Sequence, residues 1–199
     1  MRSRFITSAF AMVAVFGAAI FAYTVVRAVY YSPDLVAMGS LPEIAVASTA
    51  EKPVHLEIPS LGIDAKVQYV GINGRKEMAV PSNFRDVGWY KYGPVPGQRG
   101  SAVIDGHVDN GLGLPAVFNR LGEIKTGADV FVTTKDGARL RFVVVDVRSY
   151  PYEEAPKELV FEREDAAWLN LITCSGDWIK SKRTYSLRIV VYTKYVESS

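Results

Sequence analysis

The fold is indicated most clearly by residues 129–147, DVFVTTKDGARLRFVVVDV. Two runs of alternating apolar and polar residues flank the Asp-Gly pair at 136–137, and Asp-Gly supplies the positive φ angles that a two-residue hairpin turn needs. In the second run we expect Leu140 and Phe142 to face a core and Arg141 to face water. The stretch therefore predicts a β-hairpin with one buried face.

The rest of the chain repeats this pattern of short strands separated by turn residues. The predicted strands are 54–58, 66–70, 101–104, 129–134, 140–147, 169–173 and 188–192. They indicate an all-β fold, with short helices predicted only at 115–121 and 162–168. A closed barrel is favoured over a sandwich because closure removes exposed strand edges.

The N-terminus carries a long apolar run. The 22 residues between Arg4 and Arg27 include no charge, and as a helix they would extend about 33 Å, which is enough to cross a bilayer. A cleaved secretory signal also starts with basic residues, but its apolar region is usually shorter, about 7 to 15 residues. We therefore expect one transmembrane helix, with Arg2 and Arg4 keeping the N-terminus in the cytoplasm.

This assignment divides the chain into three parts. Residues 1–31 form the cytoplasmic tip and anchor, residues 32–53 a proline-containing linker, and residues 54–199 a single domain outside the cell. The net charge of +2 comes from mixed signs, without a block of Lys and Arg interleaved with aromatic residues. Nucleic-acid binding is therefore not expected.

The only cysteine, Cys174, follows an apolar run and precedes a Ser-Gly turn. A single cysteine cannot form an intramolecular disulfide, which is its usual structural role in an exported protein. Two interpretations remain: a thiol nucleophile presented at a strand end, or a small buried apolar side chain.

A proton-handling partner for the thiol has two candidates, because the chain has two histidines. His55 alternates with apolar residues inside a predicted strand, where a solvent-facing side chain is expected. His107 follows an apolar strand, in a turn that contains glycine and asparagine, which is typical of ligand-binding positions. We therefore select His107.

Acyl transfer also needs a group that stabilises negative charge on a carbonyl oxygen, and arginine suits this role. Arg188 begins a predicted strand that follows Cys174 after 13 residues, so the two strands can pair. Arg183 lies in a basic loop run and is the alternative.

Together these features resemble the sortase family. The resemblance is carried by Thr173-Cys174 at a strand end, by the upstream run Gly106-His107-Val108-Asp109 and by the downstream arginine. It extends through residues 56–63 and 87–90 and covers residues 54–196. The context of the cysteine and histidine is more similar to the class E and F sortases than to the calcium-assisted class A type.

The resemblance implies an eight-stranded β-barrel and a cysteine transpeptidase on the outer face of a Gram-positive-type membrane. Such an enzyme cleaves a sorting signal of Leu-Pro-x-Thr-Gly type and joins the new carboxyl end to an amine. The implied partners are secreted proteins with that signal, an amine from a peptidoglycan precursor or a pilin, and membrane lipid around the N-terminal helix. No cofactor is implied.

In this resemblance Cys174 is the nucleophile, His107 the general acid and base, and Arg188 the donor to the oxyanion. The residues expected to position or contact the substrate are Thr173, Ala102, Ile104 and Asp109, and the segment 150–168 is expected to select it. Asp105 and Asp109 are too few carboxylates for a calcium site, so no metal is predicted.

Two other functions fit the same sequence. A cysteine endopeptidase would resolve the same thioester with water, and a membrane-tethered binding or scaffolding domain would keep the barrel without turnover. An added amine separates the first from a transpeptidase, and Cys174→Ala separates the second from both enzymes.

Overall fold

The computed structural model describes residues 17–26 and 52–197. Residues 17–26 form a helix, which is the described portion of the predicted membrane span. No helix in the described ranges has both the length and the hydropathy to cross a membrane. Residues 1–16 of the predicted anchor and residues 27–51, which hold most of the predicted linker, lie outside the described residues.

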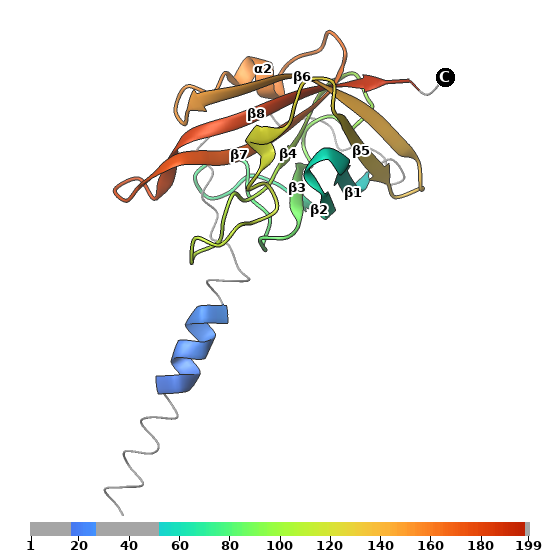
Figure 1. Ribbon diagram of the computed structural model, residues 1–199. Coiled ribbons are helices and arrows are strands. Elements are labelled where there is room, and N and C mark those ends of the chain that lie inside the picture. Colours follow the sequence, from blue (N-terminus) through green and yellow to red (C-terminus); the bar gives the residue numbers. More distant parts are fainter. Residues whose placement is uncertain (1–16, 27–51, 198–199) are drawn as a thin grey trace, which may run out of the picture.

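Eight strands close into a barrel, as the sequence analysis expected (Figure 1). They are β1 (Pro53–Ile58), β2 (Ile63–Val70), β3 (Val87–Tyr90), β4 (Gly100–Asp105), β5 (Asp129–Thr134), β6 (Arg139–Pro151), β7 (Ala167–Ile179) and β8 (Thr184–Val196). Their order around the barrel is β1-β2-β3-β4-β7-β8-β6-β5, and the β1–β5 pairing closes it. The β2–β3 and β4–β7 pairs are parallel, and the other pairs are antiparallel.

The predicted hairpin forms between β5 and β6, but its turn is longer than the two residues predicted: Thr134 N donates to the Ala138 carbonyl, and Asp136 does not have a positive φ. Gly137 has a φ of +88° in the turn, and Phe131 of β5 pairs with Arg141 of β6. Phe142 is fully buried and Arg141 is exposed, so the inward and outward faces are those that the alternation predicted.

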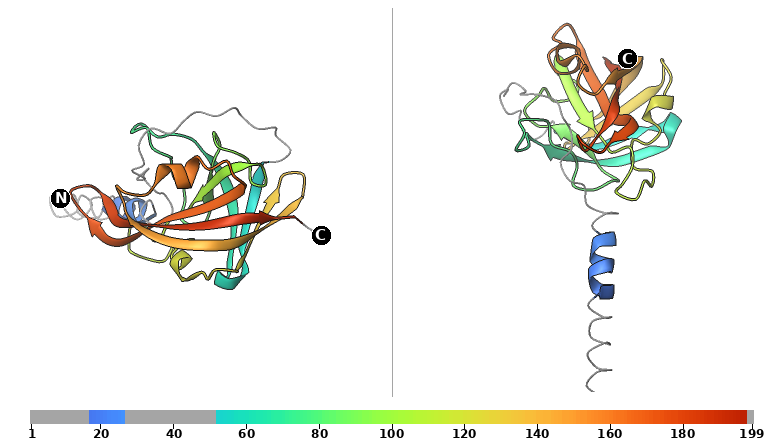
Figure 2. Two further views of the ribbon diagram at one scale, coloured as in Figure 1. Left: turned by 90° about the horizontal axis from the view of Figure 1, so that it is seen from above. Right: turned by 90° about the vertical axis from the view of Figure 1, so that its left-hand side faces the viewer.

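Apolar side chains form two clusters on the two faces of the same sheet. The first fills the barrel and includes Trp89 and Leu171. The second includes Ile172 and Val190 and lies on the outer face. There it packs against the connection between β6 and β7, which contains the short helix α2 (Lys157–Phe161) and lies against the outside of the barrel (Figures 1 and 2).

Neither of the two helices predicted from the sequence forms. The helix predicted at 162–168 is wrong: α2 ends before it, and β7 begins at Ala167. The helix predicted at 115–121 is also wrong, because that stretch consists of turns before the short 3₁₀ helix η2 (Leu121–Glu123). A second 3₁₀ helix, η1 (Pro59–Leu61), joins β1 to β2.

Strands β7 and β8 are longer than predicted, and their hairpin projects beyond the barrel (Figure 1). We call the part of this hairpin from Ser175 to Leu187 the β7–β8 arm. Its register shifts between Ser175 and Trp178, where β7 carries one residue more than β8. Gly176 occupies this bulge with a φ of +79°, a conformation that glycine adopts without a side-chain clash.

Candidate active site

Cys174 of β7 and Arg188 of β8 are direct partners in the antiparallel register. Paired residues on neighbouring strands project from the same face, with Cβ atoms about 5 Å apart. In the parallel β4–β7 pair, Asp105 is level with Ile172, and His107 follows two residues after β4 ends, in the turn whose Gly106 carbonyl accepts from Thr173 Oγ1. The thiol and the guanidinium therefore form one row across β7 and β8, and the imidazole comes from the turn after β4, the other neighbour of β7.

The turn that carries His107 is fixed by hydrogen bonds at its backbone. Thr173 Oγ1 donates to the Gly106 carbonyl at 2.7 Å, and the His107 carbonyl accepts from the Phe118 amide at 2.9 Å. A Cβ at Gly106 would lie 2.5 Å from the Phe118 ring, which is too close for any side chain. Glycine before the histidine is thus required by close packing.

The imidazole itself has two identified neighbours. Its ring lies 5.0 Å from the Phe84 ring, centre to centre, and its Nε2 lies 3.2 Å from the Pro81 carbonyl oxygen. Because a carbonyl oxygen can only accept, this hydrogen bond requires a proton on Nε2.

Arg188 is almost completely buried, with 1% of its surface exposed. Its Nη1 donates to the carbonyls of Tyr185 and Leu187 at 3.1 and 2.9 Å, and its Nη2 donates to Thr184 Oγ1 at 2.7 Å. The Tyr152 ring lies 5.7 Å from the guanidinium carbon. Among the described residues, Arg188 Nε is buried and has no hydrogen-bond partner, so its N–H is an unused donor on the residue that pairs with Cys174.

Cys174 is partly exposed, and its thiol has a raised pKa. Burial is the largest cause, because it disfavours the charged thiolate. The positive charge of Arg188 lowers the pKa, whereas the negative charges of Asp105 and Asp109 raise it further. The neutral thiol therefore dominates at neutral pH, and a proton acceptor is needed to form the nucleophile.

Three residues expected to position or contact the substrate are buried in the protein. Ala102 and Ile104 are fully buried in the barrel interior, on the face of β4 opposite to the row of Cys174. Contact with a substrate, which the sequence analysis expected for both, does not fit this location. Thr173 is also buried, and its hydroxyl supports the turn before His107, which is a positioning role.

The other predicted residues lie nearer the surface. Asp109 is partly exposed and accepts a hydrogen bond from the Tyr185 hydroxyl. Arg183, the alternative to Arg188, is exposed in the turn between β7 and β8, with a left-handed φ of +53°. The strand register therefore places Arg188, and not Arg183, opposite Cys174.

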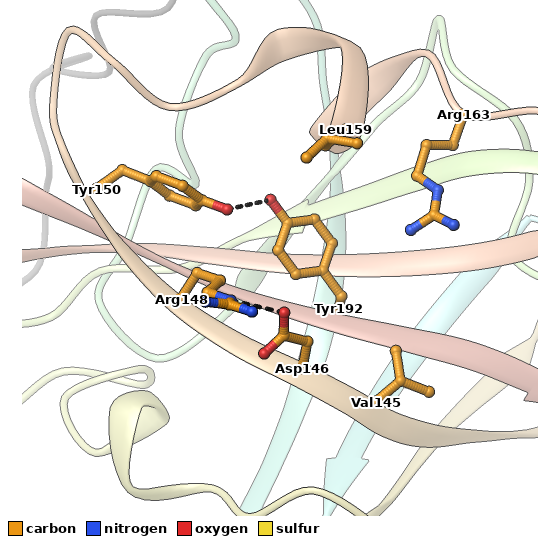
Figure 3. Close-up of a pocket in the computed structure, with 7 residues that line it drawn as sticks. All are labelled: Val145, Asp146, Arg148, Tyr150, Leu159, Arg163 and Tyr192. Carbon is orange, nitrogen blue, oxygen red and sulfur yellow. Dashed lines mark hydrogen bonds and ion pairs between the residues drawn. The ribbon is translucent and has the colours of Figure 1, made fainter.

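The segment 150–168 forms one side of a hollow on the outer face. Asn170 of β7 holds this segment in place, because its amide donates to the Val160 carbonyl at 2.6 Å. Figure 3 shows the hollow, whose lining side chains are Val145, Asp146, Arg148, Tyr150, Leu159, Arg163 and Tyr192. Tyr150 pairs with Arg188 in the β6–β8 register, so the hollow adjoins Arg188 on the side away from Cys174.

Several residues of the site were not found from the sequence. Pro81 contributes only a backbone carbonyl, and Phe84 and Tyr152 approach from loops, so no residue pattern points to them. Tyr185 lies three residues before Arg188, and a tyrosine in a strand is common. Within the described ranges, no group of three or more His, Cys, Asp or Glu side chains is arranged to hold a metal ion.

Comparison with known proteins agrees with this architecture. Residues 56–196 match the family model of the sortase domain. No protein with a curated description matches the chain.

Solved structures show the same fold at low identity. Sortase A from Corynebacterium diphtheriae is similar with a TM-score of 0.57 and 20% identity, over 74% of this chain and 63% of that protein, which is less than two thirds of its length. Sortase C-1 from Actinomyces oris has a TM-score of 0.55 and 20% identity, over 81% of this chain and 90% of that one. A sortase D5 transpeptidase from Clostridium perfringens has a TM-score of 0.54 and 15% identity, over 78% and 83%.

The family match covers every strand of the barrel except the first three residues of β1. It also includes His107, Cys174 and Arg188. The eight-stranded barrel and the matched domain together show that this chain belongs to the sortase family of cysteine transpeptidases.

Proposed function

We propose that this protein is a membrane-anchored transpeptidase that cleaves a C-terminal sorting signal of Leu-Pro-x-Thr-Gly type and joins the new carboxyl end to an amine. The observation that carries the proposal is the pairing of Cys174 with Arg188, with His107 in the turn after β4, the strand that pairs with β7. A nucleophile, a proton carrier and an oxyanion donor are the three groups that acyl transfer needs.

The first half of the reaction forms a thioester. His107 accepts the proton of Cys174, and the thiolate attacks the carbonyl carbon of the scissile peptide bond. Negative charge develops on the carbonyl oxygen and is stabilised by the Nε–H of Arg188. When the C–N bond breaks, His107 donates its proton to the departing amine.

The second half transfers the acyl group. An incoming amine attacks the thioester carbon, and His107 accepts the proton that this amine loses. The C–S bond breaks, a new amide forms, and the sulfur leaves as the thiolate. The raised pKa of Cys174 means that the thiolate is the minor form of the resting enzyme, so the His107 base is needed in the first step.

The membrane location and the partners are part of the same proposal. The uncharged run between Arg4 and Arg27 supports an anchor with a cytoplasmic N-terminus, which would put the barrel outside the cell. Secreted proteins with a sorting signal would then supply the acyl group, and a peptidoglycan precursor or a pilin would supply the amine.

The test is intact-mass analysis of the full chain in detergent after incubation with a library of sorting-signal peptides. We expect a thioester adduct of one peptide fragment on the parent and none on Cys174→Ala. Adding an amine should convert the adduct to an amide product. A product that forms equally well without amine would identify an endopeptidase, and an unchanged phenotype with Cys174→Ala in cells would identify a binding domain.

The assignment of Arg188 has a matched control in Arg183. Arg188→Lys removes the guanidinium beside Cys174 and should slow turnover by about 100- to 1000-fold, as expected when an oxyanion donor is lost. Arg183→Lys makes the same change in the exposed turn and should leave turnover within about twofold of the parent. Equal losses in the two variants would contradict the role of Arg188.

A further inference from the structure

The loop that carries His107 is tied to the β7–β8 arm by a side-chain contact that the reaction itself does not use. The Tyr185 hydroxyl donates a hydrogen bond to a carboxylate oxygen of Asp109. Asp109 lies two residues after His107, and Tyr185 lies three residues before Arg188. One hydrogen bond therefore joins the segments that supply the proton carrier and the guanidinium.

Tyr185 is itself fixed at three points. Its carbonyl oxygen accepts from Arg188 Nη1 at 3.1 Å, its ring packs edge-on against Trp178 at 5.2 Å between centres, and its hydroxyl binds Asp109. Burial and the hydrogen bond to Asp109 raise the pKa of Tyr185. The phenol therefore stays protonated and remains a donor at neutral pH.

Asp109 is held from its own side as well. It forms a β-bridge with Pro115, and the Asn110 amide donates to the Leu114 carbonyl at 2.9 Å, so the chain turns back tightly after Asp109. Asp109 therefore belongs to a tight turn, and the hydrogen bond from Tyr185 to Asp109 restrains this whole turn.

The contact lies on the face of β8 opposite to the guanidinium. Side chains alternate along a strand, and Tyr185 lies three positions before Arg188, an odd offset. The Tyr185 side chain therefore lies off the row of Cys174 and Arg188, and its hydroxyl reaches the loop of His107 at Asp109.

His107 lies between two residues that are hydrogen-bonded to β7 and β8. Thr173 binds Gly106 on one side of it, and Tyr185 binds Asp109 on the other. Both hydrogen bonds attach the loop to the β7–β8 hairpin that carries Cys174. The hydrogen bonds on the two sides of the histidine thus help to fix the loop that carries the imidazole relative to the strand that carries the thiol.

We propose that Tyr185 and Asp109 are positioning residues that hold the loop of His107 against the strands of Cys174 and Arg188. The turnover assay of this inference rests on the proposed function. It compares Tyr185→Phe and Asp109→Ala with the double variant. Each single change should lower kcat about tenfold and alter KM less than about twofold, because catalytic geometry is lost while substrate contacts remain. The double variant should be no slower than the singles, because both remove the same hydrogen bond.

Two variants separate positioning from a general loss of structure. Asp109→Asn keeps an oxygen that accepts from Tyr185, and should keep kcat within about threefold of the parent. Tyr69→Phe also removes a phenol hydroxyl, from a ring on β2 that packs edge-on against Trp89, and should leave kcat unchanged. Unchanged kcat in Tyr185→Phe, or single losses that multiply in the double variant, would overturn the proposal.

A second readout needs no sorting signal. The rate at which iodoacetamide alkylates Cys174 is measured with and without His107→Ala, in the parent and in Tyr185→Phe. We expect the effect of His107→Ala to shrink at least about threefold in Tyr185→Phe, because the histidine is no longer held beside the thiol. An effect of the same size in both backgrounds overturns the inference, whereas failure of every peptide to react counts only against the proposed function.

Discussion

At the scale of single residues, the chemistry of the site depends on the charges around the Cys174 thiol. Asp105 and Asp109 both raise the pKa of Cys174, and Arg188 alone opposes them and the effect of burial. A carboxylate near a thiol disfavours the thiolate, so removing a carboxylate favours it. The reactivity of Cys174 is therefore limited by its neighbours and rises when one negative charge is removed.

This balance predicts a pH dependence. The alkylation rate of Cys174 should rise with pH as the thiol ionises, with a midpoint above the value of about 8.5 for an ordinary cysteine. Asp109→Asn should move the midpoint down, since the pKa falls when the negative charge is lost. Asp129→Asn removes a partly exposed carboxylate on β5, which pairs with Arg141, and is the control. A midpoint that does not move with Asp109→Asn, or that moves equally with Asp129→Asn, would contradict the charge argument.

The sequence predicts some of these residues better than others. Cys174 is found because it follows an apolar strand and is the only cysteine. His107 is found because it follows an apolar strand and is the better placed of the two histidines. The Tyr185–Asp109 contact joins positions 76 residues apart, and the carbonyl of Pro81 has no side-chain signature. Contacts of this kind arise from the path of the chain and cannot be read from local pattern.

The decisive feature at the scale of elements is the bulge that begins the β7–β8 arm. Gly176 lies two residues after Cys174 with a φ of +79°, and a Cβ there would be 2.3 Å from Ser186 Oγ. Asp177 N also donates to Ser186 Oγ at 2.9 Å, so the hydroxyl has little freedom to move away. The bulge thus fixes the direction in which the arm leaves the catalytic pair.

Gly176→Ala should therefore disturb the site as well as the fold. Alanine at a positive φ costs about 1 kcal/mol in unfolding free energy, and the clash adds to this cost. We expect a lower melting temperature and a loss of most thiol reactivity, measured by alkylation of Cys174. Gly137→Ala is the matched control, because Gly137 has a φ of +88° but a Cβ added there would have no atom within 4 Å. It should lose stability and keep full reactivity; equal losses of reactivity would show that the bulge has no special role.

Element prediction failed where burial or tertiary packing hides the local pattern. All four residues of β3 are buried, so Val87–Tyr90 shows no alternation and was not predicted as a strand from its pattern. The stretch 162–168 has helix-forming acids near its start, but its end joins the long strand β7, where Trp168 and Leu169 are buried. Alternation identifies β6, which has one wet face, whereas the predicted strand at 101–104 lies in β4, which is buried throughout and is bounded by turn residues.

At the scale of the whole molecule, apolar packing covers both faces of the strands that carry Cys174 and Arg188. One apolar cluster fills the interior, and the second lies between the outer face and the β6–β7 connection. His107, Cys174 and Arg188 lie within the matched domain, and every described strand begins at or after Pro53. The closed sheet leaves no strand edge that an N-terminal segment would need to cover.

This self-contained architecture predicts that the proposed catalysis does not depend on the proposed anchor. A chain that starts at residue 52 should fold and alkylate at Cys174 at the parent rate, because no described part of the site lies outside it. The full chain should stay with membranes after a carbonate wash, whereas the shortened chain should be released. Ala14→Arg combined with Ala18→Arg keeps the length of the N-terminal run but adds about 2.5–3.5 kcal/mol of insertion cost per arginine, and should release the full chain as well. A full chain that washes off would show that the apolar run is not an anchor, and a shortened chain with an unreactive Cys174 would show that the N-terminal residues support the site.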